Sequence, residues 1–160
     1  MSTAPSHIVV LTLDNENDGD IVGNAAEAPF LNQIISQGML FTNSNGLTHP
    51  SPDNYMALFS GSTQGAVLNN IPSQYPASVP TLDSALAAMG YTFGGYAETG
   101  ADPQRAPWFD FANSAADGDD FSAFPQTGAG FASLFAVSFI EPNDADNMTP
   151  VSDSGGGIAV

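Results

Sequence analysis

The chain has 160 residues, the length of one domain, and 42% of them are hydrophobic, which is enough to form a buried core. Seventeen acidic residues face a single basic residue, Arg105, and the net charge of −16 argues against binding to nucleic acids or anionic membranes. With no cysteine and two histidines, one copy of the chain cannot form a disulfide, a thiolate zinc site or a three-histidine zinc site.

The predicted elements alternate between strands and helices along the chain. Strands are expected over 7–13, 39–43, 91–97 and 136–140, and helices over 28–38, 51–60 and 81–89. Ser51 can cap the middle helix, Pro52 suits its first position, and Gly61 can end it. This alternation predicts an α/β fold with a mainly parallel sheet and flanking helices, in which sites form beyond the carboxyl ends of the strands.

An oxygen-rich loop follows the first predicted strand. Its side chains are Asp14, Asn15, Glu16, Asn17, Asp18 and Asp20. Oxygen ligands suit hard cations such as Ca²⁺, Mg²⁺ or Mn²⁺, whereas a solvated polar loop is the alternative interpretation of the same residues. The spacing follows the first half of an EF-hand, but Ala25 stands where that loop needs a bidentate glutamate. A true EF-hand is therefore not expected.

The turn before residues 51–60 offers a second candidate site. A serine at a helix N-terminus can hold or attack a phosphate, although most such serines are only helix caps. Asn54 lies one turn further on and can donate to a phosphoryl oxygen. His49 can orient a substrate or act as a general acid, or it can be a packed loop histidine. Arg105 is the only Lys or Arg that could contact a phosphate, but lone surface arginines are common.

Taken together, these segments resemble a known family. Residues 7–65, which include "HPSPDNYMALFSG", and the later motifs "GYTFGGYAE", "PWFDF", "FSAFP" and "VSFIEPN" occur in the family's order. The family is the phosphoesterases of the acid phosphatase and phospholipase C type, in the alkaline phosphatase superfamily. Its members open with an apolar strand followed by Glu-Asn, and later carry "H-P-S-x-P-N-Y-x-A-L-x-S-G". The resemblance covers most of the chain, as the N-terminal portion of such an enzyme.

The resemblance implies roles for four residues. Asp14 and Asn15 match the metal-binding Glu and Asn, Ser51 matches the nucleophile, and Asn54 matches the Asn that contacts the phosphoryl group. The implied activity is metal-dependent hydrolysis of a phosphoric ester through a phosphoseryl intermediate. The implied substrate is a small-molecule or lipid phosphoester. We expect the metal to be Ca, Mg or Mn rather than Zn, because the ligands are oxygens.

The chain also departs from the family pattern. Asp14 is shorter than Glu, Asp53 stands where a Pro is usual, and Arg105 replaces a His. Asn147 and Thr149 stand where the family has Asp and His, and the family continues beyond the end of this chain. These departures predict that the isolated chain hydrolyses phosphoesters slowly or not at all. The alternatives are a non-catalytic acidic Ca-binding domain or an inactive fragment.

The expected organisation is one phosphoesterase-like domain over residues 1–160, incomplete at its carboxyl end. The family is usually secreted or periplasmic, but residues 1–6 lack the basic and apolar regions of a signal peptide. No run approaches the roughly 18 apolar residues that span a bilayer, so membrane insertion is not expected. The oligomeric state cannot be read from the sequence.

Overall fold

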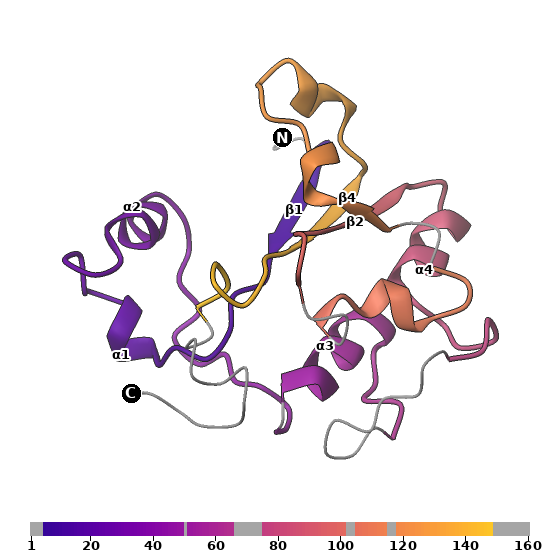
Figure 1. Ribbon diagram of the computed structural model, residues 1–160, viewed down its shortest axis with the longest axis horizontal. Helices are drawn as coiled ribbons and strands as arrows, with labels where there is room; N and C mark the ends of the chain where they lie inside the picture. The colour runs from indigo at the N-terminus through magenta and orange to yellow at the C-terminus, as the bar shows by residue number, and fades with distance from the viewer. Residues whose placement is uncertain (1–4, 50, 66–74, 102–104, 115–117, 149–160) are drawn as a thin grey trace.

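A computed structural model describes residues 5–49, 51–65, 75–101, 105–114 and 118–148. Within these residues, four parallel strands form one sheet in the order β1-β4-β2-β3 (Figure 1). The strands are β1 (Ile8–Leu11), β2 (Phe93–Ala97), β3 (Gly118–Asp120) and β4 (Val137–Glu141). The prediction of an α/β fold with a mainly parallel sheet is therefore confirmed.

The helices of the described residues are α1 (Asp18–Ile21), α2 (Pro29–Gln37), α3 (Ser51–Ser60) and α4 (Leu82–Ala88). The last three follow the predicted spans closely, whereas α1 falls at the end of the oxygen-rich segment predicted to be a loop. Helix α3 begins and ends where its local signals predict, because Pro52 suits the first turn and Gly61 adopts a φ of +76° directly after the last residue. Figure 1 shows α1 and α2 on one side of β1, and α3 and α4 on the other side.

The predicted strand over 39–43 is wrong. This segment connects α2 to α3 and forms no part of the described sheet. Its apolar side chains remain exposed, with Met39 at 78% and Phe41 at 74%. Short apolar runs become strands only where a neighbouring strand accepts their backbone hydrogen bonds, and no strand of the described sheet pairs with this segment.

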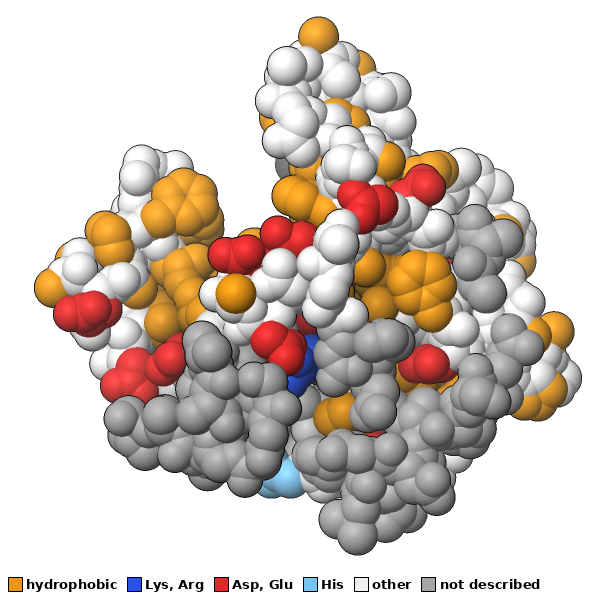
Figure 2. Space-filling view, viewed as in Figure 1, with side chains coloured by type: hydrophobic (Ala, Val, Ile, Leu, Met, Phe, Trp, Pro, Cys, Tyr) orange, Lys and Arg blue, Asp and Glu red, His pale blue; other side chains and the backbone are white. Residues whose placement is uncertain are grey.

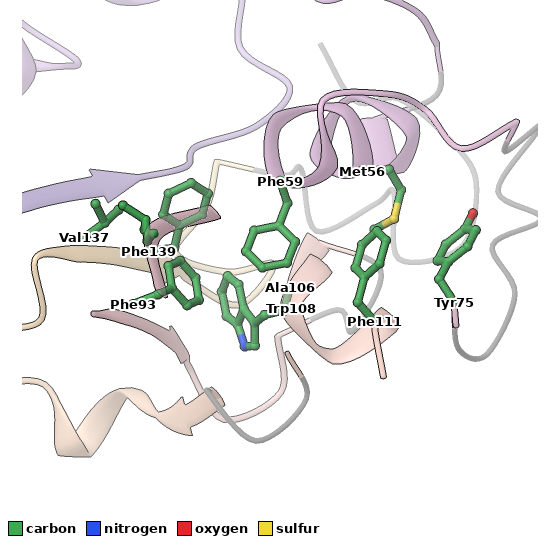
Figure 3. Close-up of a cluster of buried hydrophobic side chains, with 10 residues drawn as sticks. Met56, Phe59, Tyr75, Phe93, Ala106, Trp108, Phe111, Val137 and Phe139 are labelled. Carbon is green, nitrogen blue, oxygen red and sulfur yellow. The ribbon is translucent and has the colours of Figure 1, made fainter. Parts of the chain in front are cut away.

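The hydrophobic core lies between the sheet and α3. Phe59 of α3 packs against Phe93 of β2 and Phe139 of β4, with ring centroids 5.3 and 6.3 Å apart (Figure 3). Trp108, in the 3₁₀ segment η2 (Pro107–Asp110), is 1% exposed and lies on the same sheet face. This packing fixes α3, and with it the N-terminal turn of that helix, relative to the strands.

A glycine in β2 makes the close approach of the indole possible. A Cβ built at Gly95 would lie 2.3 Å from the Trp108 ring, nearer than side-chain carbons approach one another. The indole therefore lies directly against the backbone of a central strand. The segment that precedes Trp108, which includes Arg105, is held near the carboxyl ends of the strands by this contact.

Candidate active site

A pocket of about 350 Å³ opens between the carboxyl end of β1 and the start of α3. Its lining residues are Thr12, Leu13, Asp14, Gly46, Ser51, Asn54, Tyr55 and Leu58. The loops that follow β4 and β2 bring further polar side chains beneath it, so three parallel strands deliver residues to one edge of the sheet. The pocket has the size and the position that are typical of a small-molecule site in an α/β protein.

Ser51 and Asp14 meet in this pocket, as the sequence predicts. The Ser51 hydroxyl donates a hydrogen bond to Asp14 Oδ1 over 3.1 Å. The backbone N–H of Asn15 donates to the same oxygen over 2.8 Å, and the Asp14 N–H donates to the carbonyl of Asn147 over 2.8 Å. These contacts hold Asp14 where it can accept a proton from the serine.

Arg105 lies beneath the pocket rather than on the open surface. Its Nε is 2.9 Å from Asp14 Oδ2, and its Nη1 pairs with Asp144 Oδ1 in the loop after β4. The Arg105 side chain is 12% exposed, and that of Asp14 is 11% exposed. Because water screens such a pair poorly, the Arg105 guanidinium attracts the Asp14 carboxylate strongly and fixes its direction.

Glu141, the last residue of β4, is a buried acid beside this ion pair. It is 0% exposed and accepts a hydrogen bond from the Thr12 hydroxyl. Burial raises the pKa of Glu141 to about 7, while the Thr12 hydrogen bond and the positive charge of Arg105 oppose that shift. Burial, with the charges of Glu141 and Asp14, also raises the pKa of Tyr55 well above its ordinary value. Tyr55 is therefore a neutral hydroxyl at physiological pH.

We expect Glu141→Gln to stabilise the protein at pH 8 and to have little effect near pH 4.5. The folded-state pKa is raised from 4.5 to about 7, so ionising Glu141 costs stability as the pH rises through that interval. Glutamine keeps the size of the side chain and accepts from Thr12 without carrying a charge. The gain at pH 8 should be about 1–3 kcal/mol by urea unfolding. A gain that does not change with pH would contradict the buried-charge explanation.

Asn54 lies in the pocket wall, but its amide holds a loop. Its Oδ1 accepts from the backbone N–H groups of Leu47 and Thr48 over 2.7 and 3.1 Å, and its Nδ2 donates to the Thr48 carbonyl over 2.8 Å. The contacts of Asn54 thus fix the loop that precedes α3. Its predicted contact with a phosphoryl group stays a prediction.

The other predicted residues lie further from the pocket. The side chain of Asn15 is exposed, with the backbone at a φ of +62°, and neither Asn15 nor His49 is among the lining residues. His49 is exposed in the loop before α3. Thr149 falls outside the described residues, whereas Asn147 is fully buried next to Asp14.

In the arrangement seen here, the described residues do not fit a divalent metal. Among them, no group of three or more His, Asp or Glu side chains gathers in a way that could hold an ion. At Asp14, one carboxylate oxygen faces Ser51 and the other faces the Arg105 guanidinium. Asp18 and Asp20 of the predicted cation loop belong to α1 instead, where Asn17 donates to Asp20. The expectation of Ca, Mg or Mn thus stays a prediction.

Two residues of this site were not identified from the sequence as site residues. Glu141 follows an apolar strand directly, and a carboxylate at the carboxyl end of a parallel strand is a signal that could have found it. Asp144 lies in an ordinary polar loop, and nothing in its local sequence predicts its contact with Arg105.

Comparisons with known proteins support the phosphoesterase resemblance. The chain is 36% identical over 155 residues to a phosphatidylinositol-3-phosphatase of Mycobacterium tuberculosis, a match that covers 89% of this chain and 50% of that protein. It is 37% identical over 75 residues to an acid phosphatase of Aspergillus fumigatus, covering 47% of this chain and 17% of that protein. No family model matches, and no solved structure is significantly similar.

These similarities make the chain a homologue of curated phosphatases, so the predicted resemblance to phosphoesterases is confirmed. The chain spans half or less of the length of the two curated relatives. Within the described residues, none of the helices is long and apolar enough to cross a bilayer.

Proposed function

We propose that this phosphoesterase homologue hydrolyses phosphoric esters of the small-molecule or lipid class, and that Ser51 is its nucleophile. The observation that carries the proposal is the 3.1 Å hydrogen bond from the Ser51 hydroxyl to Asp14 inside the pocket. The two curated relatives are both named phosphatases, which supports phosphoester hydrolysis as the reaction class. The proposed placement is in the alkaline phosphatase superfamily.

The proposed reaction has two displacements at phosphorus. In the first, Ser51 Oγ bonds to phosphorus as its proton passes to Asp14, the bond from phosphorus to the ester oxygen breaks, and that oxygen takes up the proton from Asp14 and leaves as the alcohol. In the second, water attacks the phosphoseryl phosphorus and gives a proton to Asp14, the bond from phosphorus to Ser51 Oγ breaks, and Oγ takes up that proton as inorganic phosphate leaves. Ser51 begins α3, so the positive end of the helix dipole faces the transferred group and stabilises its negative charge.

The role of each neighbouring residue in the proposed reaction follows from its contacts. Asp14 receives the proton because its Oδ1 already accepts the serine hydrogen bond, and Arg105 orients that carboxylate. Asn54 fixes the loop that forms one wall of the pocket. No step is assigned to a metal, since the described residues do not complete a metal site.

The experiment that tests the proposal is to trap the phosphoseryl group. The chain is incubated with p-nitrophenyl phosphate, quenched in acid, digested and examined by mass spectrometry. We expect the peptide with Ser51 to carry one phosphoryl group, and the Asp14→Asn variant to carry much less, because it lacks the proton acceptor. Parallel reactions with EDTA or with added Mn²⁺, Mg²⁺ or Ca²⁺ test the predicted metal dependence. Release of p-nitrophenol without any label on Ser51 would disprove the covalent mechanism.

A further inference from the structure

Arg105 is the only Lys or Arg of this acidic protein, and its side chain is largely buried at the Ser51 pocket. The chain has seventeen acidic residues and one arginine. If this arginine only balanced the surface charge, its side chain would be expected in solvent. Arg105 instead has a side chain that is 12% exposed and pairs with Asp14 and Asp144. Because the arginine is buried, the face shown in Figure 2 carries several acidic areas and little basic surface.

The guanidinium lies where a cation would bind Asp14. Its Nε is 2.9 Å from Oδ2, and a divalent ion would need that oxygen at about 2.0–2.6 Å. The other oxygen, Oδ1, already accepts from Ser51 and from the Asn15 backbone. An incoming ion would therefore have to displace a like charge that is held by two carboxylates.

Two elements position Arg105 for this contact. The residue stands just before Trp108, whose indole is packed against Gly95 of β2, and the loop after β4 brings Asp144 to its Nη1. Both anchors belong to the folded core and to the sheet edge, so the guanidinium is held in place without a ligand.

We propose that Arg105 is the resident cation of the Ser51 pocket and occupies the place of a divalent metal on Asp14. Asp14 is then neutralised by a side chain of the protein itself, and metal ions bind this carboxylate only when Arg105 is removed. In the proposed hydrolysis Arg105 is a positioning residue, because it acts through its contacts with Asp14 and Asp144. Arg105 can occupy this cation position whether or not the chain hydrolyses phosphoesters.

The test is a titration with Mn²⁺, in which free Mn²⁺ is measured by electron paramagnetic resonance. It uses the whole chain as wild type, Asp14→Asn, Arg105→Gln and the double variant. Exposed carboxylates will bind some Mn²⁺ weakly in all four, so the differences between the variants carry the result. We expect Asp14→Asn to bind as wild type does. Arg105→Gln should gain one site at least about tenfold tighter than the background, and the double variant should lose it.

Two results would overturn the proposal. If Asp14→Asn binds less Mn²⁺ than wild type, a metal already occupies Asp14 beside Arg105. If a folded Arg105→Gln variant gains no site, the guanidinium does not occupy a cation position. Circular dichroism establishes that each variant is folded, and the comparison of wild type with Asp14→Asn remains decisive even if Arg105→Gln unfolds. Arg105→Lys, which keeps the charge, should gain no tight site, and a gain there would also contradict the proposal.

Discussion

Ser51→Ala is expected to lower the turnover of p-nitrophenyl phosphate by about 10²–10⁴-fold, the range typical of a positioned group that takes part in bond making or proton transfer. The alanine removes the attacking oxygen and the hydrogen bond to Asp14, while the pocket and the helix stay in place. Because the wild-type rate is itself expected to be low, the assay needs high protein concentration and long incubation. The residual rate of the variant measures binding and charge stabilisation without a nucleophile.

Ser60→Ala is the matched control for this prediction. Ser60 ends the same helix, and its hydroxyl donates to the carbonyl oxygens of Met56 and Ser62, away from the pocket. We expect Ser60→Ala to keep the wild-type rate within about twofold, with a small loss of stability from the missing hydrogen bonds. Equal rates for wild type and Ser51→Ala would show that any phosphate release has another origin. The proposed nucleophile would then be wrong.

Local signals explain which parts of the fold could be predicted. Helix α3 was located at both ends because Pro52 and Gly61 act on the backbone within one turn. The sheet class followed from the alternation of strands and helices. The meeting of Asp14 and Ser51 followed from the rule that sites gather at the carboxyl ends of parallel strands.

The remaining features depend on partners that are distant in the sequence. Residues 39–43 have the composition of a strand, but no strand of the described sheet pairs with them. Strand β3 has two aspartates and a glycine, so its pairing with β2 could not be predicted from its own residues. Arg105 stands out in the sequence as the only Lys or Arg, but its contact with Asp14 depends on the folding of three separate loops.

The site residues likewise divide into those that local sequence predicts and those whose contacts depend on distant parts of the chain. A serine at a helix start and a following asparagine indicate a phosphate site, and both residues do line the pocket. The asparagine, however, uses its amide to hold residues 47 and 48, a contact that depends on how the loop folds back. Glu141 is likewise buried at the end of β4 and accepts from Thr12, which follows β1, so its environment depends on a segment far away in the sequence.

Phe59→Ala is expected to destabilise the protein by about 3–5 kcal/mol, which is the usual cost of removing a buried phenylalanine from a core. The ring is 1% exposed and contacts Phe93, Phe111 and Phe139, so its loss leaves a cavity between α3 and the sheet. Since domains of this size are stable by only about 5–15 kcal/mol, a large part of the total stability would be lost. Urea unfolding followed by tryptophan fluorescence measures the change, because Trp108 lies in the same cluster.

Leu58→Ala provides the comparison within the same helix. Leu58 is the neighbouring residue, is 51% exposed and faces the pocket, so its truncation should cost less than about 1 kcal/mol. The two variants differ by one position along α3 and separate core packing from helix propensity. If both cost the same, α3 is not held through Phe59, and the position of Ser51 would have to be fixed by its contact with Asp14 instead. A large difference would establish that the aromatic core, built from strands far apart in the sequence, is what presents the serine to the pocket.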